Sequence, residues 1–141
     1  NNGSAFKKLK EMVKAQGGDV SVLDDTDKFE KASVKYEVKA KESGYIHSMN
    51  TEKCGIASVV LGAGRETKES SIDFSAGIIL EKNVGDQVNE GETIATLYSS
   101  DIEKCKNAEN ILQGAIEISR EKPEFIPIIH ARVSKDGVER F

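Results

Sequence analysis

The sequence predicts an α+β protein in which a small, largely antiparallel sheet or barrel packs against helices. Apolar and charged residues alternate from Val34 to Lys39, which is the period of a half-buried strand. Apolar residues recur at three- and four-residue spacing in residues 5–15, and again from Ala108 to Ala115, as in amphipathic helices. Strand and helix patterns follow one another without strict β-α-β alternation, and this favours α+β.

Composition limits both the size and the class of the protein. Its 141 residues, 38% of them hydrophobic, suit one domain, or one domain plus an appendage, with a modest core. A net charge of −4 argues against broad nucleic-acid binding, which needs a surplus of Lys and Arg. No apolar run approaches the roughly 20 residues that span a bilayer, and the polar, Lys-rich start does not resemble a secretory signal. Two cysteines make no disulfide framework, so we expect a cytoplasmic protein with reduced thiols.

The first predicted element is an amphipathic helix over residues 5–15. Ser4 is the expected N-cap, and Gly17-Gly18 ends the helix. Its apolar stripe must dock on residues 33–141 or on another copy of the chain. The stripe consists of Phe6, Leu9, Met12 and Val13. Because the chain begins without an initiator methionine and almost directly in a helix, we interpret it as a piece of a longer protein.

The next elements are two strands and a helix. An aspartate-containing connector leads to a strand from Ser33 to Lys39, and a second strand covers Tyr45 to Met49. Asn50 or Thr51 then caps a helix that Gly62-Ala63-Gly64 ends. This helix is apolar over most of its circumference, so we expect it to be buried.

Residues 65–141 alternate between turns, short strands and one more helix. After a charged loop over residues 65–71, we expect a short extended piece at 72–74, strands at 77–80 and 93–98, and a hairpin region at 83–91. Ser100 to Glu103 matches a capping box that opens a helix. Two prolines then mark a break, and a final strand is expected at 128–133.

The glycine-rich turn Gly62-Ala63-Gly64-Arg65 is the first candidate for a functional site. It follows a helix instead of opening one, and no Gly-Lys-Ser/Thr is present, so a structural turn is favoured over a phosphate cradle. Gly62, Gly64 and Arg65 remain candidates for a loop that contacts another domain or a cleft, because an arginine stands directly after two glycines.

The other reactive residue types do not form a catalytic or metal-binding pattern, and no catalytic, cofactor-binding or metal-binding residue is predicted. Neither histidine has a partner at a metal-ligand spacing. One cysteine is expected to fill the core, and the other, Cys105, to be exposed and inert, although its flanking lysines could lower its pKa. The aspartates of the connector lack the glycine and glutamate of a calcium loop. These residues are His47, His130, Cys54, Cys105, Asp24, Asp25 and Asp27.

The segment Val84 to Ile94 resembles the hairpin of biotinyl and lipoyl carrier domains, V-G-D-x-V-x-x-G-x-x-I/L. In this pattern Gly85 and Gly91 take turn conformations, while Val88 and Ile94 point into a small core. Tyr98 to Asp101 stands where the lysine-bearing tip of a carrier should follow. A stand-alone barrel-sandwich binding or carrier-like module is therefore the alternative interpretation.

Several stretches, in order, resemble the C-terminal part of pyrimidine-nucleoside phosphorylases of the thymidine phosphorylase family. Residues 5–19 resemble A-x-x-K-F-K-x-M-x-x-A-Q-G-G-D, and residues 43–46 resemble D-G-Y-V. Residues 61–65 match L-G-A-G-R, residues 73–78 resemble D-x-x-V-G-I, and the hairpin at 85–91 completes the set. The resemblance runs from about residue 3 to the end of the chain.

This resemblance implies the fold, the parent reaction and the partners. Residues 1–32 would be the terminal helix and linker of the catalytic α/β domain, and residues 33–141 the C-terminal domain, an α/β hammerhead or barrel-sandwich element. The parent pentosyltransferase would convert uridine or thymidine and phosphate, its co-substrate, into a free base and a (deoxy)ribose 1-phosphate in pyrimidine salvage. The family's catalytic motifs lie in its N-terminal two thirds. We therefore expect this chain to be inactive alone, to pair with those catalytic domains, and to belong to a homodimeric parent.

Overall fold

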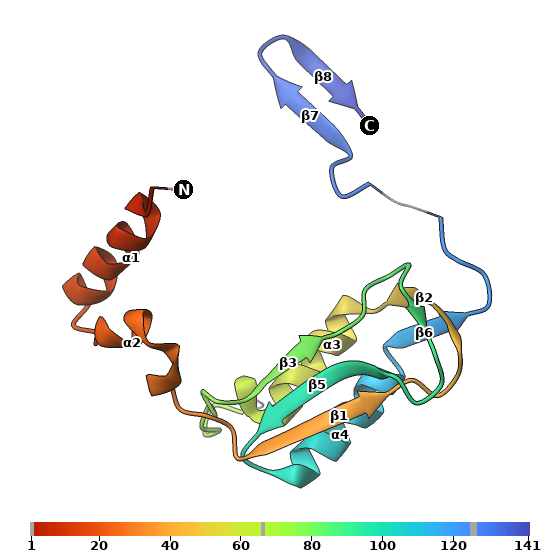
Figure 1. Cartoon of the computed structure of the whole chain (residues 1–141), viewed down its shortest axis with the longest axis horizontal. Helices are drawn as coiled ribbons and strands as arrows, with labels where there is room; N and C mark the ends of the chain where they lie inside the picture. The colour runs from red at the N-terminus through yellow and green to blue at the C-terminus, as the bar shows by residue number, and fades with distance from the viewer. Residues whose placement is uncertain (1, 66, 125–126) are drawn as a thin grey trace.

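The computed structural model describes residues 2–65, 67–124 and 127–141, which form a mixed body of helices and strands with two outlying elements (Figure 1). The helical elements are α1 (Ser4–Ala15), α2 (Ser21–Asp24), the 3₁₀ turn η1 (Thr26–Lys28), α3 (Thr51–Ser58), the π-helical turn η2 (Val59–Ala63) and α4 (Ile102–Gln113). The strands are β1 (Val34–Lys39), β2 (Gly44–Met49), β3 (Gly77–Leu80), β4 (Gln87–Val88), β5 (Thr93–Ser99), β6 (Ile116–Ser119), β7 (Ala131–Ser134) and β8 (Gly137–Arg140).

The described strands form three antiparallel sheets, in the orders β1-β5-β3, β4-β2-β6 and β7-β8. In the first sheet Leu97 of β5 lies between Tyr36 of β1 and Ile78 of β3. In the second, Ile46 of β2 is paired with Ile118 of β6. The predicted α+β class with small antiparallel sheets is confirmed, and these sheets do not close into a barrel.

The core lies between the two larger sheets and helices α3 and α4. Helix α4 packs against α3, η2, β1 and β5, so one helix face covers the first sheet. The largest fully buried side chains include Ile46, Leu61, Ile94, Leu97 and Leu112. Burying an aliphatic side chain of this size contributes about 1.5–3 kcal/mol, so these five residues account for much of the stability of the body.

The segment around Gly85 and Gly91 connects the two larger sheets. Both glycines have positive φ, 92° and 79°, which confirms their predicted turn conformations. The Gly85 amide donates to the Ile46 carbonyl at 2.8 Å, and the Gly91 amide donates to the Ala40 carbonyl at 2.9 Å. Val88 and Ile94 are buried, as predicted, so this segment fastens β2 to the chain that follows β1.

The caps of the helices differ in part from the predictions. Gly3, with φ 73°, occupies the N-cap position of α1, and Ser4 is already helical. Asp101 caps α4 by accepting from the Glu103 amide at 2.8 Å, so the assignment of the cap to Ser100 was wrong. Asn50 caps α3 as expected, because its side chain accepts from the Lys53 amide at 3.0 Å.

Several element boundaries also differ. Helix α3 is less buried than expected: Ala57 is its one fully buried residue, and Ile56 is exposed. Residues 72–74 form no strand, because the Ala76 amide donates to the Asp73 carbonyl and closes a turn. The expected connector contains α2 and η1, strand β7 begins at Ala131, and strands β6 and β8 were not predicted.

Helix α1 keeps its apolar stripe largely exposed. Phe6, Leu9 and Met12 are between 43% and 54% exposed, so the expected docking onto residues 33–141 is not present in the single chain. The neighbouring contact is polar, an ion pair between Lys10 and Asp24. Among the described helices, no helix is both long and apolar enough to cross a membrane.

Candidate functional site

The predicted turn at Gly62 and Gly64 ends η2 and is held by residues far away in the sequence. Gly62 has φ 114° and is buried, which accounts for the glycine at this position. The Ser99 hydroxyl donates to the Leu61 carbonyl at 2.8 Å, and the Asp73 amide donates to the Gly62 carbonyl at 2.9 Å. The end of β5 and the turn before β3 thus fix the end of the helix.

Asp73 organises this junction and was not predicted as a site residue. One carboxylate oxygen accepts from the amide and hydroxyl of Ser75, at 2.9 and 2.6 Å. The other accepts from the Ser100 amide at 3.0 Å. The Ser75 and Ser100 hydrogen bonds lower the pKa of Asp73 from 3.8 to about 2. Asp73 followed two residues later by a serine is the Asx-turn signal that could have indicated it.

Arg65 follows this junction with an exposed side chain. Gly64 before it is extended, with φ −140°, and packs against Val59. A small cavity of about 70 Å³ lies beside the two glycines. It is lined by Val59, Val60, Gly62, Gly64, Ser70, Ser71 and Lys104. Ser70 and Ser71 belong to the charged loop expected at residues 65–71, of which residue 66 lies outside the described residues.

The two cysteines are in apolar surroundings. Cys105 is fully buried, so the prediction that it is exposed was wrong. Burial raises the pKa of the Cys105 thiol, and burial also raises the pKa of Cys54, which is the opposite of an activated thiolate. Cys54 packs against the core, as expected.

The histidines and the connector aspartates do not come together. His47 and His130 are both exposed. Asp24 pairs with Lys10, Asp27 pairs with Lys31 at 2.8 Å, and Asp25 caps η1. Within the part of the chain that the structure describes, no group of three or more His, Cys, Asp or Glu residues could hold a metal ion.

Tyr98 to Asp101 lies at the end of β5 and not at a hairpin tip. Tyr98 is paired with Lys35 of β1 and Gly77 of β3, and Asp101 begins α4. The position at which a carrier domain would present its lysine is therefore occupied by the junction of a central strand with a helix.

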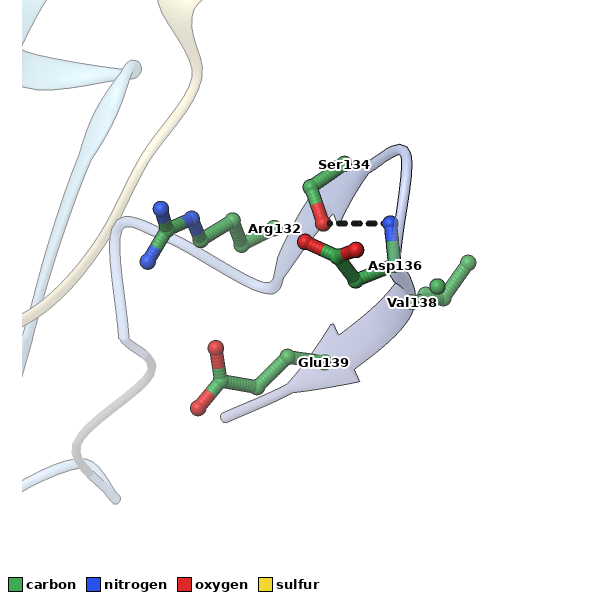
Figure 2. A pocket seen from close by; sticks show the side chains of 6 residues that line it. Arg132, Ser134, Asp136, Val138 and Glu139 are labelled. Atoms are coloured by element: carbon green, nitrogen blue, oxygen red, sulfur yellow. Dashed lines mark hydrogen bonds between the residues drawn. The ribbon is translucent and has the colours of Figure 1, made fainter.

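Two surface hollows are polar and open. One, of about 420 Å³, lies over β1 and β5, where Lys39 binds Glu37 and Lys82 binds Glu92; these lysines lower the pKa of both carboxyls. The other, of about 360 Å³, is shown in Figure 2. All six residues that line it belong to β7, β8 and their turn, where the Asp136 amide donates to the Ser134 hydroxyl oxygen at 3.2 Å. Neither hollow is suited to acid–base catalysis. In the first, Glu37 and Glu92 are paired with lysines, and the second is lined by residues of a single hairpin.

Comparison with known proteins gives a consistent result. A family model described as the pyrimidine nucleoside phosphorylase C-terminal domain matches residues 45–119, from β2 to the end of β6. The chain is 45% identical over 100 residues to a pyrimidine-nucleoside phosphorylase of Staphylococcus aureus (strain USA300), covering 71% of the chain and 23% of that relative. It is 46% identical over 99 residues to the pyrimidine-nucleoside phosphorylase of Bacillus subtilis (strain 168), covering 70% of the chain and 23% of that relative. The matched part thus spans about a quarter of the length of these curated relatives.

Proposed function

Because the chain belongs to the pyrimidine nucleoside phosphorylase C-terminal domain family, we propose that it is the accessory C-terminal domain of such an enzyme. The observation that carries the proposal is the 45% identity to a named phosphorylase across 71% of the chain. The parent reaction is the phosphate-dependent cleavage of uridine or thymidine to a free base and (deoxy)ribose 1-phosphate, by a cytoplasmic homodimer. In this proposal the domain supplies no catalytic residue.

The geometry of the described residues supports an accessory role. The thiols of Cys54 and Cys105 have raised pKa values, and the carboxylate of Asp73 is committed to amide and hydroxyl donors. A catalytic base or nucleophile needs a free lone pair directed at substrate. These groups instead stabilise the fold, so the chemistry belongs to the catalytic part of the parent.

The loop that begins at Arg65 is the proposed point of contact with that catalytic part. Gly62 and Gly64 hold the backbone in a fixed turn, and Arg65 leaves this turn with its guanidinium exposed. An exposed arginine on a fixed backbone loses little freedom when it binds a carboxylate or phosphate oxygen. We propose that Gly62, Gly64 and Arg65 form an interdomain or cleft loop.

A chimera tests the proposed function. The portion of the Bacillus subtilis phosphorylase that precedes the matched residues is fused to this chain, and phosphate-dependent release of uracil from uridine is measured. We expect activity in the chimera and none in the 141-residue chain alone. Uracil release by the chain alone, or a folded chimera without activity, would overturn the proposal.

The loop is tested in the same chimera by Arg65→Ala. We expect kcat or KM to change at least several-fold, because a charge-assisted hydrogen bond contributes roughly 1.5–3 kcal/mol. Arg120→Ala, at an exposed arginine after β6, is the matched control. An Arg65→Ala chimera with unchanged kcat and KM would remove the proposed contact.

A further inference from the structure

The hairpin β7–β8 is exposed on all sides. Every residue from Ala131 to Arg140 is exposed, and the hairpin stands away from the body of the molecule (Figure 1). Its register is regular, with Val133 opposite Val138, and the Phe141 amide extends the ladder by donating to the His130 carbonyl at 3.2 Å. An isolated two-stranded hairpin is at best marginally stable in water. We therefore expect this regular hairpin to pack against a partner that stabilises it.

The two faces of the hairpin differ in chemistry. Arg132 lies opposite Glu139 on one face, where opposite charges suit contact with water. Because side chains alternate along a strand, Val133 and Val138 lie on the other face. In Figure 2 the Val138 side chain points away from Arg132 and Glu139. The two valines are 78% and 61% exposed.

A second group of exposed apolar residues lies at the end of the hairpin away from its turn. Ile128, Ile129 and Phe141 are all exposed, and with Pro127 they line a hollow of about 390 Å³. Exposed apolar groups that gather on one element mark an interaction site more often than single exposed residues do. We define the hairpin patch as Ile128, Ile129, Val133, Val138 and Phe141.

We propose that the hairpin patch docks on the catalytic part of the parent phosphorylase, and that β7–β8 fastens the C-terminal domain to it. The inference rests on the proposed function. About three quarters of each curated relative lies outside the match, which leaves ample chain to cover the patch. The patch lies beyond the residues 45–119 of the family model, as does the exposed stripe of α1 at the other end of the chain. Both flanking elements thus present apolar surface that the domain does not cover.

The charges disfavour a second copy of the chain as the partner. Helix α1 carries four lysines and one glutamate, and residues 131–140 carry three basic and two acidic residues. A contact between copies through the two exposed apolar surfaces would bring elements of like net charge together, which is unfavourable. The catalytic part of the parent is therefore the occupant that we propose.

Hydrogen exchange in the chimera tests the docking. We expect the amides of residues 131–140 to exchange at least tenfold more slowly in the chimera than in the chain alone. Val133→Asp should abolish this protection in the chimera and leave the stability of the isolated chain unchanged. Ser134→Asp is the matched control on the opposite face, since a carboxylate can still accept from the Asp136 amide. Unchanged protection of residues 93–99 would show that a variant chimera keeps its folded body.

The outcomes separate this inference from the proposed function. An active chimera with an unprotected hairpin would overturn the docking and leave the function intact. A protected hairpin in an inactive chimera would support the docking and overturn the function. If the hairpin is protected in the chain alone and light scattering gives a dimer, a second copy is the occupant and the inference is wrong. Equal loss of protection in Val133→Asp and Ser134→Asp would also contradict it.

Discussion

Replacing Asp73 with asparagine should destabilise the body of the protein at neutral pH. The carboxylate joins the turn before β3 to the start of α4, because it accepts from Ser75 and from the Ser100 amide. The Asp73 amide meanwhile donates to the carbonyl of Gly62. Asparagine keeps one acceptor oxygen and turns an NH₂ group toward donors, so at least one N–H or O–H group loses its partner.

The pKa of Asp73 sets the size and the pH dependence of this effect. A drop from 3.8 to about 2 corresponds to roughly 2.4 kcal/mol at 1.36 kcal/mol per pH unit. Asp73 is partly accessible to solvent, so the expected loss is smaller, about 1–2 kcal/mol. The folded-state pKa lies below the unfolded-state value. The stabilisation is therefore present above about pH 4 and disappears as the pH falls through about 2.

Urea unfolding followed by circular dichroism measures the effect. Wild type and Asp73→Asn are compared at pH 7, 4 and 2.5, and the difference in the free energy of unfolding should shrink toward the lowest pH. Asp25→Asn is the control, because Asp25 is exposed and accepts a single amide, that of Asp27. We expect it to cost less than about 0.5 kcal/mol. Equal stability of Asp73→Asn and wild type at pH 7, or a loss that stays constant down to pH 2.5, would refute the reasoning.

Two further predictions concern the same body. Gly62→Ala should cost about 2–3 kcal/mol in urea unfolding, since φ is 114° and the new Cβ would lie 3.3 Å from Cβ of Asp73. Gly85→Ala should cost only about 1 kcal/mol, because its φ of 92° is strained for alanine but the added Cβ would have no atom within 4 Å. A larger loss of stability at Gly85 than at Gly62 would contradict this prediction. Ellman's reagent at pH 8 should label Cys54 first and Cys105 only on unfolding, because Cys105 is fully buried, and rapid labelling of both in the native protein would contradict the structure.

Elements with a clear local period could be predicted, and those that depend on distant partners could not. Strand β1 alternates cleanly, so its position was correct. Strand β6 has only four residues and is separated from the end of α4 by two residues, so it is defined by its pairing with β2, where Met49 lies opposite Ile116. Strand β8 was missed in the same way, because its partner β7 was expected to end the fold as a single strand.

The burial of Cys105 shows how sequence neighbours can mislead. Lys104 and Lys106 flank it, but successive residues on a helix point about 100° apart, so flanking charges say little about exposure. Cys105 instead shares a face with Ala108 and Leu112 at spacings of three and seven, and all three are fully buried. Extending the helical stripe back from Ala108 would have predicted this correctly.

The glycine-rich turn was predicted as a structural turn, and its backbone is held by hydrogen bonds from other parts of the chain. Two segments distant in sequence fix the backbone from Leu61 to Gly64 through Ser99 and Asp73, and the nearby Val59 packs against Gly64. The first residue of a loop that follows a rigid turn is held in position by that turn, whatever the rest of the loop contacts. Ordering a side chain there costs less than ordering it on a free loop. In the proposed contact, the glycines would fix the position of the backbone and the exposed guanidinium of Arg65 would supply a directional charge.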